Sequence, residues 1–489
     1  MRTYIAAVLF IITILASAQK EANNWYFGNK AGISFESGSP SFLLDGALIY
    51  SHGTSTISDS AGNLLFYTDG EHVYNRIHQQ MPNGYGLLGN SLSQTSLIMR
   101  KPESYNEYYI FTVGNGTIYP LIGLHYSLVK MNLDGGLGDI YLKNVPLAHS
   151  NNAVEKITAI CNSVNSGFWV IVRNLTQPVN EFHSYLVTSN GISTIPVKTN
   201  CLSNILIEGS GNNMGQMKIS PDGKFIVSPT GPGDPSTEIG VFNNQTGKIM
   251  NSFSLVFPLG HYGVEFSSDS HFIYFTSYSL DEQNRLLQYD LSLLPDQEAF
   301  ENSLIDIGEL GNGLDLQIGL DGRIYVARNY NDYLGVINNP SLKGVACDYD
   351  SLGVYLGGRK CYRGLPQFIQ TYFLRFEYNG QCAGDTYTFT PNFNPVPDSI
   401  HWDFGDPASG ANNYSNELNP QHLYQTGGLY NVTAFVRYPD GRTETANRDV
   451  TVAQLPLPYP GNDTLFCKGS SIILQAQSGY DSYLWSTNE

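Results

Sequence analysis

Short apolar segments rich in aromatic and β-branched residues recur along the chain, and each follows a turn of small polar residues. Six copies lie between residues 64 and 330, with starts spaced by roughly 44 to 60 residues. Such a spacing is typical of an architecture built from one repeated supersecondary unit. Residues of these types favour pleated sheets, so each copy predicts a β-strand. The six predicted strands are residues 64–68, 108–112, 168–172, 225–228, 272–276 and 323–327.

The turn before these strands is repeated as well. Residues 220–224 read Ser-Pro-Asp-Gly-Lys, and residues 319–323 read Gly-Leu-Asp-Gly-Arg. Asp-Gly favours a hairpin because both residues tolerate positive φ. A second apolar strand precedes the turn at residues 217–219, 264–266 and 316–318. We expect these strands to be the innermost strands of four-stranded units.

A single unit of this kind cannot bury both faces of its sheet, so the copies predict a closed ring, a β-propeller. Residues 364–369 read as a further inner strand, and residues 25–28 and 32–35 supply outer strands from the other end of the chain. Joining the two ends in one blade removes an exposed sheet edge. The sequence therefore predicts an all-β fold with a seven-bladed β-propeller over residues 19–375; six or eight blades are the alternatives.

After the propeller, residues 376–453 read as a small sandwich of short strands separated by turn signals. The segment carries Trp-Asp-Phe-Gly-Asp, then His-Leu-Tyr, then Gly-Leu-Tyr-Asn-Val, and in this it closely resembles the PKD domain family. The resemblance implies an immunoglobulin-like β-sandwich that acts as a spacer or binding module. It also implies that the core is filled by Trp402 and that the turn is held by two aspartates. The motif residues are Trp402, Asp403, Phe404, Gly405, Asp406, His422, Tyr424, Gly428 and Tyr430.

The two ends of the chain carry predictions of their own. Residues 1–18 combine an early arginine, an apolar run and a small-x-small ending, which predicts a secretory signal peptide rather than a membrane span. Residues 454–460 form a proline-rich linker. Residues 461–489 read as the beginning of a second immunoglobulin-like sandwich, cut short. We expect the natural chain to continue past residue 489.

The order of these parts, beginning with Asn-Trp-Tyr-Phe-Gly at residues 24–28, resembles exported surface proteins of Bacteroidetes. The Ser-Pro-Asp-Gly-Lys turn resembles the repeats of WD40/TolB-like propellers, which bind partners. Together these resemblances imply a secreted protein at the bacterial cell surface. They also imply export by the type IX secretion system, as for gliding-motility-associated proteins.

Charge argues against nucleic acid as a partner, and the cysteine content predicts disulfides. The chain has 43 acidic and 26 basic residues, a formal charge of −17, and such a surface repels nucleic-acid phosphates. No transmembrane segment is predicted. Six cysteines in an exported chain favour disulfides. The candidate pairs are Cys347 with Cys361 and Cys161 with Cys201, whereas the partners of Cys382 and Cys467 stay open.

No established catalytic spacing is present: the chain has neither a G-x-S-x-G elbow nor an H-E-x-x-H helix. The prediction is therefore a protein without enzymatic activity. Ligands of closed rings meet loops at one mouth. The candidate binding residues at the propeller mouth are His52, Glu155, Lys218, His261, Glu265, Asp315, Gln317 and Arg363.

Four of the inner-strand positions also have a purely structural interpretation. Lys218, Glu265, Gln317 and Gln367 occupy one register, so they suit the polar lining of a water-filled channel. Lys218 and Glu265 suit an ion pair inside the ring equally well.

No cofactor is predicted, although residues 134–139 and 348–353 resemble parts of calcium loops. Each fragment offers two carboxylates, whereas calcium takes six to eight oxygen ligands. Five aromatic residues are candidates for stacking on sugar rings, with core packing as the alternative. They are Trp25, Tyr85, Tyr119, Tyr262 and Tyr330.

The sequence thus predicts non-catalytic binding and adhesion at the cell surface, with glycans or surface proteins as partners. One alternative is a propeller glycoside hydrolase or lyase with the sandwich as a spacer, since a glycosidase needs only two suitably placed carboxylates. A structural stalk segment is the other alternative.

Overall fold

The computed structural model describes residues 20–454 with short gaps, and a few residues between 465 and 473. The gaps are residues 90–93, 115–121, 163–166, 177–178, 203–213, 232–235, 259, 278–283, 374, 392, 394–396, 438–440 and 442. The predicted signal peptide, the proline-rich linker after residue 454 and nearly all of the second sandwich lie outside the described residues.

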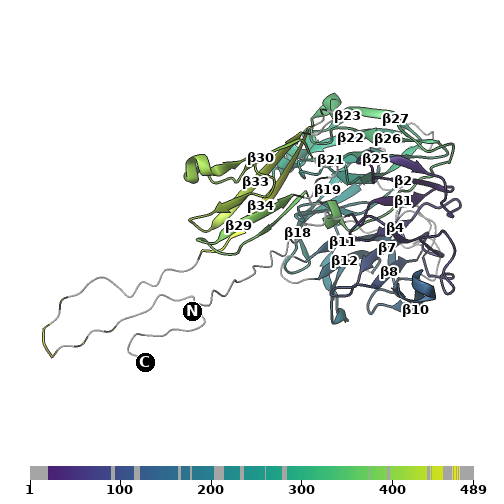
Figure 1. The fold of residues 1–489 in the computed structure, drawn as a ribbon, viewed down its shortest axis with the longest axis horizontal. Helices are drawn as coiled ribbons and strands as arrows, with labels where there is room; N and C mark the ends of the chain where they lie inside the picture. The colour runs from purple at the N-terminus through teal and green to yellow at the C-terminus, as the bar shows by residue number, and fades with distance from the viewer. Residues whose placement is uncertain are drawn as a thin grey trace, which may run out of the picture.

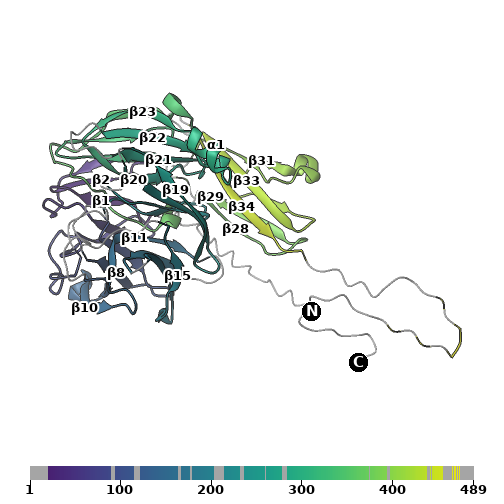
Figure 2. The ribbon, with the colours of Figure 1, turned by 180° about the vertical axis from the view of Figure 1, so that it is seen from behind.

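Antiparallel β-sheets build the described structure. Seven sheets lie around a ring, and two further sheets form a sandwich against one side of it (Figures 1 and 2). No described helix is long and apolar enough to cross a bilayer. The helical segments are α1 (Gln297–Asn302) and the 3-10 turns η1 (Asp134–Gly136), η2 (Leu291–Leu293), η3 (Gly344–Cys347), η4 (Gln370–Phe373) and η5 (Pro407–Asn413).

The ring sheets follow one another in chain order. The first two are β1 (Asn24–Phe27), β2 (Ala31–Ser34), β3 (Ser41–Leu43), and β4 (Ser55–Ser58), β5 (Leu64–Thr68), β6 (Val73–Asn75). The next two are β7 (Ser96–Arg100), β8 (Glu107–Val113), β9 (Leu124–Lys130), β10 (Asp139–Pro146), and β11 (Ala153–Cys161), β12 (Phe168–Asn174), β13 (Glu181–Thr188), β14 (Gly191–Ile192), β15 (Val197–Asn200). The last three are β16 (Lys218–Ile219), β17 (Phe225–Pro229), β18 (Ser236–Asn243), β19 (Lys248–Val256); β20 (His261–Phe266), β21 (Phe272–Ser277), β22 (Asn284–Asp290), β23 (Ile305–Gly311); and β24 (Gly313–Ile318), β25 (Ile324–Arg328), β26 (Tyr333–Ile337), β27 (Tyr349–Tyr355).

The repeated phrase of the sequence is the second strand of a sheet in all six of its copies, namely β5, β8, β12, β17, β21 and β25. Side chains fix the turn that leads into it. Ser220 Oγ donates to Asp222 Oδ1 over 2.6 Å and accepts from the Phe225 backbone N–H over 2.9 Å. Ser267 makes the same contacts to Asp269 and Phe272. The hairpin signal in the sequence therefore reflects hydrogen bonds that the side chains of the turn make.

The two ends of the ring meet as the sequence suggested, but with an irregular inner segment. Residues 364–369 form only one bridge, from Gln367 to Ser55 of β4, and the Gln367 N–H donates to the Thr54 carbonyl over 2.8 Å. Pro366 lies in this segment and has no N–H for a ladder, which limits regular pairing. The segment nevertheless packs against the first sheet, where the rings of Trp25 and Phe368 are 5.8 Å apart.

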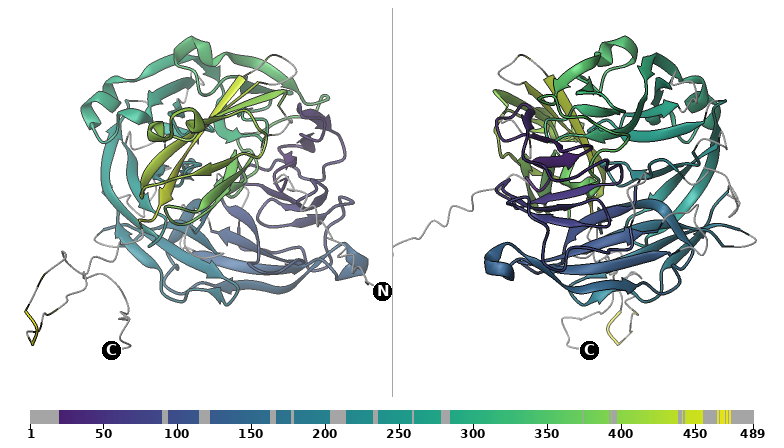
Figure 3. Two further views of the ribbon diagram at one scale, coloured as in Figure 1. Left: turned by 60° about the vertical axis from the view of Figure 1, so that its left-hand side comes forward. Right: turned by 90° about the vertical axis from the view of Figure 1, so that its right-hand side faces the viewer.

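The C-terminal sandwich covers the side of the ring where the turns between first and second strands lie (Figure 3, left). Its two sheets are β28 (Phe376–Asn379), β29 (Thr386–Pro391), β32 (Gln421–Leu423), and β31 (Tyr414–Ser415), β30 (Ser399–Asp403), β33 (Gly428–Arg437), β34 (Thr443–Val452). Arg375, just before β28, donates to the carbonyl of Leu320 in one of these turns over 2.7 Å. One mouth of the ring is therefore capped by the sandwich.

Inside the sandwich, the motif residues make structural contacts. Trp402 is fully buried, and its indole N–H donates to the Glu417 carbonyl over 3.0 Å. Asp403 accepts from the Gly405 N–H and from the Asn413 amide. Asp406 Oδ2 and His422 Nε2 lie 3.1 Å apart, and the carboxylate accepts from the ring when Nε2 carries the proton. These contacts hold the turn between β30 and η5.

The remaining motif residues pack around this turn. Gly405 has φ +67°, and a Cβ there would lie 2.5 Å from the Asn431 carbonyl oxygen. The hydroxyl of Tyr424 donates to the Phe404 carbonyl over 2.9 Å, and the rings of Tyr424 and Tyr430 lie 4.1 Å apart. Gly428 begins β33.

Both predicted disulfides are absent, because all six cysteines are free thiols. Cys347 and Cys361 stand on opposite sides of β27, and a seven-residue strand spans about 20 Å or more. Cys161 pairs with Phe168 at one end of its sheet, whereas Cys201 follows β15 near the opposite end, three strands away. A disulfide needs Cα atoms within about 7 Å. Strand geometry therefore excludes both pairings.

We expect alkylation with iodoacetamide in denaturant, without reductant, to label all six cysteines, since none is held in a disulfide. Intact-mass spectrometry of the labelled protein checks this. Four labels in the wild type and three in Cys382→Ser would show a disulfide that does not involve Cys382 and would contradict the free-thiol assignment.

Candidate functional site

The centre of the ring is filled by side chains that take the place of backbone partners. The Gln94 side chain accepts from the Met217 N–H over 2.8 Å and donates to the Met217 carbonyl over 3.0 Å and to Gln367 over 2.7 Å. Gln216 accepts from the N–H groups of Val264 and Leu316 over 3.1 and 3.0 Å. Each glutamine thus joins inner strands of different sheets.

A buried ion pair completes this network. Lys218 Nζ lies 2.9 Å from Glu265 Oε2 and donates to Gln317 Oε1 over 2.5 Å. The same Glu265 oxygen accepts from the Ile318 N–H over 3.0 Å. The predicted ion pair inside the ring is therefore present. Direct hydrogen bonds between side chains, rather than an open lining, join Lys218, Glu265 and Gln317.

The structure separates the eight predicted mouth residues into two groups. Six are buried: Glu155, Lys218, His261, Glu265, Asp315 and Gln317. Only His52 and Arg363 are partly exposed. Of the predicted mouth residues, only His52 and Arg363 are therefore accessible at the rim, and the other six belong to the buried interior below it.

Two titratable groups beneath the rim have displaced pKa values. Burial raises the pKa of Asp315 to about 8, against the opposing effects of Lys218, the Leu365 N–H and Lys156. Burial and Arg173 lower the pKa of Lys156 to about 7, although Glu155 and Asp315 oppose this. Lys156 Nζ donates to the carbonyls of Met214 and Gly215. Burial therefore favours the protonated form of Asp315.

At the rim opposite the sandwich, aromatic side chains from three separate segments meet. Tyr50 precedes β4, Tyr330 lies in the turn between β25 and β26, and Tyr362 follows β27. The Tyr362 ring lies 5.2 Å from Tyr50 and 4.8 Å from Tyr330, edge to face in both cases, and it stacks on His52 at 5.8 Å. Tyr50 is 60% exposed and Tyr330 is 64% exposed. We call Tyr50, His52, Tyr330, Tyr362 and Arg363 the rim cluster.

The backbone of the rim cluster is held in unusual conformations. Tyr50 and Tyr330 have φ of +54° and +58°, in the left-handed region that bulky residues rarely adopt. Such conformations concentrate at binding and catalytic sites. A Cβ on Gly364 would lie 1.8 Å from the His52 carbonyl oxygen, so glycine is needed for this close approach. The Tyr330 N–H donates to the Cys361 carbonyl over 3.0 Å, and this bond joins the turn that contains Tyr330 to the segment that contains Tyr362.

Charge at the rim comes from Arg363. Its guanidinium makes no hydrogen bond or ion pair with another described residue. Burial, together with Arg363, lowers the pKa of His52 to about 4, so His52 is neutral at neutral pH. The rim cluster therefore offers the exposed rings of Tyr50 and Tyr330, which pack on the buried ring of Tyr362, beside one cation.

Sequence reasoning identified this cluster only in part. Among the predicted stacking residues, Trp25 and Tyr262 are buried, Tyr85 is exposed beneath Lys143, and Tyr119 lies outside the described residues. Tyr330 belongs to the cluster. Tyr50 and Tyr362 were missed because nothing in a single sequence brings residues 50, 330 and 362 together.

The calcium-like fragments use their carboxylates in turns. Asp350 accepts from the Leu352 N–H over 2.8 Å, and Asp139 accepts from the backbone and side chain of Asn83. Within the described part of the chain, no group of three or more His, Cys, Asp or Glu residues suits a metal ion.

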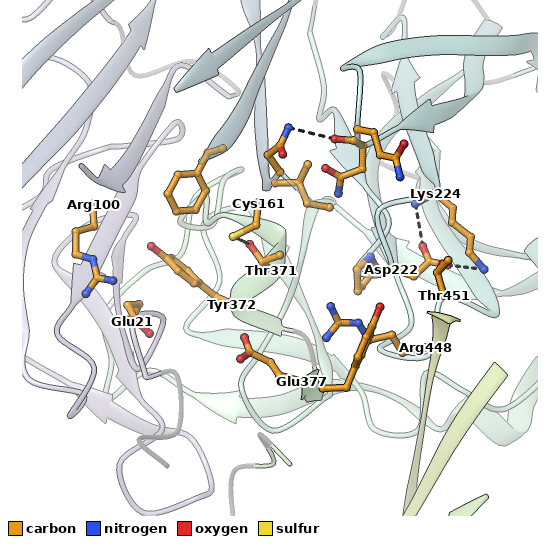
Figure 4. A pocket seen from close by; sticks show the side chains of 17 residues that line it. Glu21, Arg100, Cys161, Asp222, Lys224, Thr371, Tyr372, Glu377, Arg448 and Thr451 are labelled. Atoms are coloured by element: carbon orange, nitrogen blue, oxygen red, sulfur yellow. Dashed lines mark hydrogen bonds and ion pairs between the residues drawn. The ribbon is translucent and has the colours of Figure 1, made fainter. Parts of the chain in front are cut away.

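A cavity of about 590 Å³ lies between the ring and the sandwich. Figure 4 shows Glu21, Arg100 and Cys161 on the ring side, with Glu377 and Arg448 contributed by β28 and β34. Arg448 donates to the Phe376 carbonyl over 2.8 Å and lies over the Tyr378 ring at 4.9 Å. Charges of both signs thus line the boundary between the two domains.

The side chains that line this cavity are polar but not chemically activated. Cys161 Sγ accepts from Thr371 over 3.1 Å, and burial raises the pKa of the Cys161 thiol to about 11. Lys224 and Asp222, on the ring side, lie 3.7 Å apart. A thiolate is the nucleophilic form of cysteine, so Cys161 is not activated.

No family model and no curated protein matches this chain. Among solved structures, it is similar to the periplasmic gluconolactonase PpgL of Pseudomonas aeruginosa, at 14% identity and a TM-score of 0.33, over 78% of this chain and 92% of that one. A putative 6-phosphogluconolactonase from Bacteroides fragilis matches at 10% identity and a TM-score of 0.34, over 82% and 94%. The PKD1 domain of Vibrio anguillarum Epp matches at 25% identity and a TM-score of 0.14, over 16% and 90%. The chain is thus structurally similar to β-propeller lactonase-like proteins over most of its length and to PKD domains over a small part.

We expect Lys218→Met to lower the free energy of unfolding by about 3 kcal/mol, because it leaves the Glu265 carboxylate buried without its cation. Lys218→Met combined with Glu265→Gln recovers part of this loss, since no unpaired charge remains. Urea denaturation at pH 7 measures both variants. Equal stability of wild type and Lys218→Met would show that the pair does not hold the ring together.

Acid is expected to destabilise the ring through His261. Burial lowers the pKa of His261 to about 3, and its Nδ1 lies 2.8 Å from Thr237 Oγ1. The unfolded chain, with an ordinary histidine pKa near 6.5, binds more protons below that pH, so stability is lost as the pH falls from about 6.5 toward 3. Between pH 7 and 4.5, His261→Gln should lose about 2 kcal/mol less than wild type in urea denaturation. The exposed His401→Gln serves as control, and an equal loss in all three proteins would contradict the assignment.

Proposed function

We propose that the protein is an exported, non-catalytic binding protein of the bacterial cell surface, and that the rim cluster of the propeller binds a glycan. The observation that carries this proposal is the meeting of Tyr50, Tyr330 and Tyr362 at one rim beside Arg363. Exposed tyrosine faces stack on the apolar faces of sugar rings, and arginine donates hydrogen bonds to hydroxyl or carboxylate oxygens.

Several features support binding rather than catalysis. Glutamine and lysine side chains fill the centre of the ring, so a ligand meets a shallow rim instead of a deep channel. The ring of antiparallel sheets is consistent with propeller blades whose loops gather at the rim. Residues 1–18 read as a secretory signal peptide, which agrees with a secreted protein exported along a route such as type IX secretion. Surface proteins are the alternative class of partner.

A glycoside hydrolase or lyase is the second candidate, because of Asp315. Its Oδ1 atom is buried and has no hydrogen-bond partner among the described residues, and its pKa of about 8 keeps it protonated. A carboxylic acid held neutral at pH 7 is suited to general-acid catalysis. Glu265, in contrast, is committed to Lys218 and would serve structure.

Binding should be weakened about fivefold by Tyr330→Ala and by Tyr50→Ala, since each removes one stacking face worth about 1 kcal/mol. The measurement is titration of the protein onto immobilised neutral polysaccharides and polyuronates, with reducing-sugar release recorded in the same wells. Arg363→Gln should weaken binding to polyuronates more than to neutral polymers.

Tyr105→Ala is the matched control, because Tyr105 is 95% exposed and lies outside the cluster. Binding that survives Tyr50→Ala and Tyr330→Ala unchanged would exclude the rim cluster. Sugar release that is abolished by Asp315→Asn would replace the binding proposal with the enzyme alternative.

A further inference from the structure

We propose that the sandwich carries a second site, a groove at its edge away from the ring that binds a neutral saccharide independently of the rim cluster. The groove encloses about 500 Å³. Its walls are β31 and the neighbouring turn η5 on one side and β32 on the other. This inference goes beyond the function proposed for the propeller and does not need it to hold.

The topology places this groove in the open. In the four-stranded sheet, β34 lies against the ring and β31 is the opposite edge strand. In the three-stranded sheet, β28 lies against the ring and β32 is the opposite edge strand. The groove therefore runs between the two edges that are farthest from the propeller, and Figure 2 shows β31 at the outer end of the sandwich.

The lining has the chemistry of a saccharide site. Hydroxyl and amide side chains dominate it, and Glu417 is the only carboxylate among the described residues that line it. The side-chain amides of Asn412, Gln421 and Gln425 make no hydrogen bond to another described residue. Amides of this kind both donate and accept, which matches the hydroxyl groups of a neutral sugar. The other lining residues are Thr386, Ser409, Tyr414, Ser415, His422 and Leu423.

An aromatic face borders these amides. Tyr414 is 52% exposed, and its ring stacks on His401 with an interplanar angle of 13° at 5.8 Å. His401 Nδ1 is in turn held by Asn416 at 2.8 Å. The Tyr414 ring is therefore oriented before a ligand arrives, and an oriented ring loses little side-chain entropy on binding.

The floor of the groove is rigid. His422 lies between Asp406 and the Asn412 carbonyl, at 3.1 Å from each, and packs flat on Phe404 at 4.4 Å. The Asn413 side chain ties Asp403 to the Asp406 N–H. The motif that closes the sandwich core thus also fixes the base of the groove. Volume, polar lining, oriented aromatic and rigid floor together favour a short stretch of neutral glycan, of about two sugar rings.

The test is affinity electrophoresis of the full chain in native gels containing xylan, laminarin or hydroxyethyl cellulose. We expect one of these polymers to retard the wild type. Tyr414→Ala and Gln421→Ala should each weaken that retardation at least fivefold, and Tyr105→Ala should leave it unchanged. Unchanged melting temperatures of the variants exclude unfolding, since both altered side chains are exposed.

The variants also separate this site from the rim cluster. Retardation that is lost with Tyr414→Ala but kept with Tyr330→Ala supports the groove even if the propeller binds no glycan. Retardation that is lost only with Tyr330→Ala overturns the groove and leaves the rim cluster. Absence of retardation of the wild type in all three gels also overturns it, and a peptide added to the β32 edge then becomes the next hypothesis.

Discussion

The structure depends on glutamine side chains that hydrogen-bond to backbone groups of the inner strands at the centre of the ring. A propeller brings its inner strands together around an axis, where their backbone groups have few partners. Gln94 pairs with both the N–H and the carbonyl of Met217, as a neighbouring strand would, and then reaches Gln367. Buried polar groups without partners are expensive, so the hydrogen bonds that Gln94 makes at this position stabilise closure of the ring.

This network determines where a ligand can bind. Because Lys218, Glu265 and Gln317 satisfy one another, the axis offers little to a ligand, and binding chemistry is displaced to the loops above. The sandwich covers the opposite face through contacts such as Arg375 with the Leu320 carbonyl. The uncovered rim is where Tyr50 and Tyr330 are held at positive φ, so backbone strain and aromatic exposure coincide there.

The repeats predicted most of the fold because local signals carry it. The turn at residues 220–224 is recognisable since its own side chains make its hydrogen bonds, and strand composition does the rest. The side-chain network at the centre of the ring could not be predicted in this way. Gln94 lies 123 residues from Met217, and their contact exists only once the ring has closed. The disulfide predictions were wrong for a related reason. Cys347 and Cys361 are close in sequence, but the extended strand β27 lies between them and holds them far apart in space.

The same reasoning explains why the PKD-like motif predicted the structure of the sandwich but did not indicate which residues line the groove. Trp402, Asp403 and His422 face inward or hold a turn, so their spacing reports the core. The groove above them is lined by Asn412, Tyr414 and Gln421, residue types that are common in any exposed loop. A motif can thus specify the rigid floor of a site while the residues that would touch a ligand carry no signature.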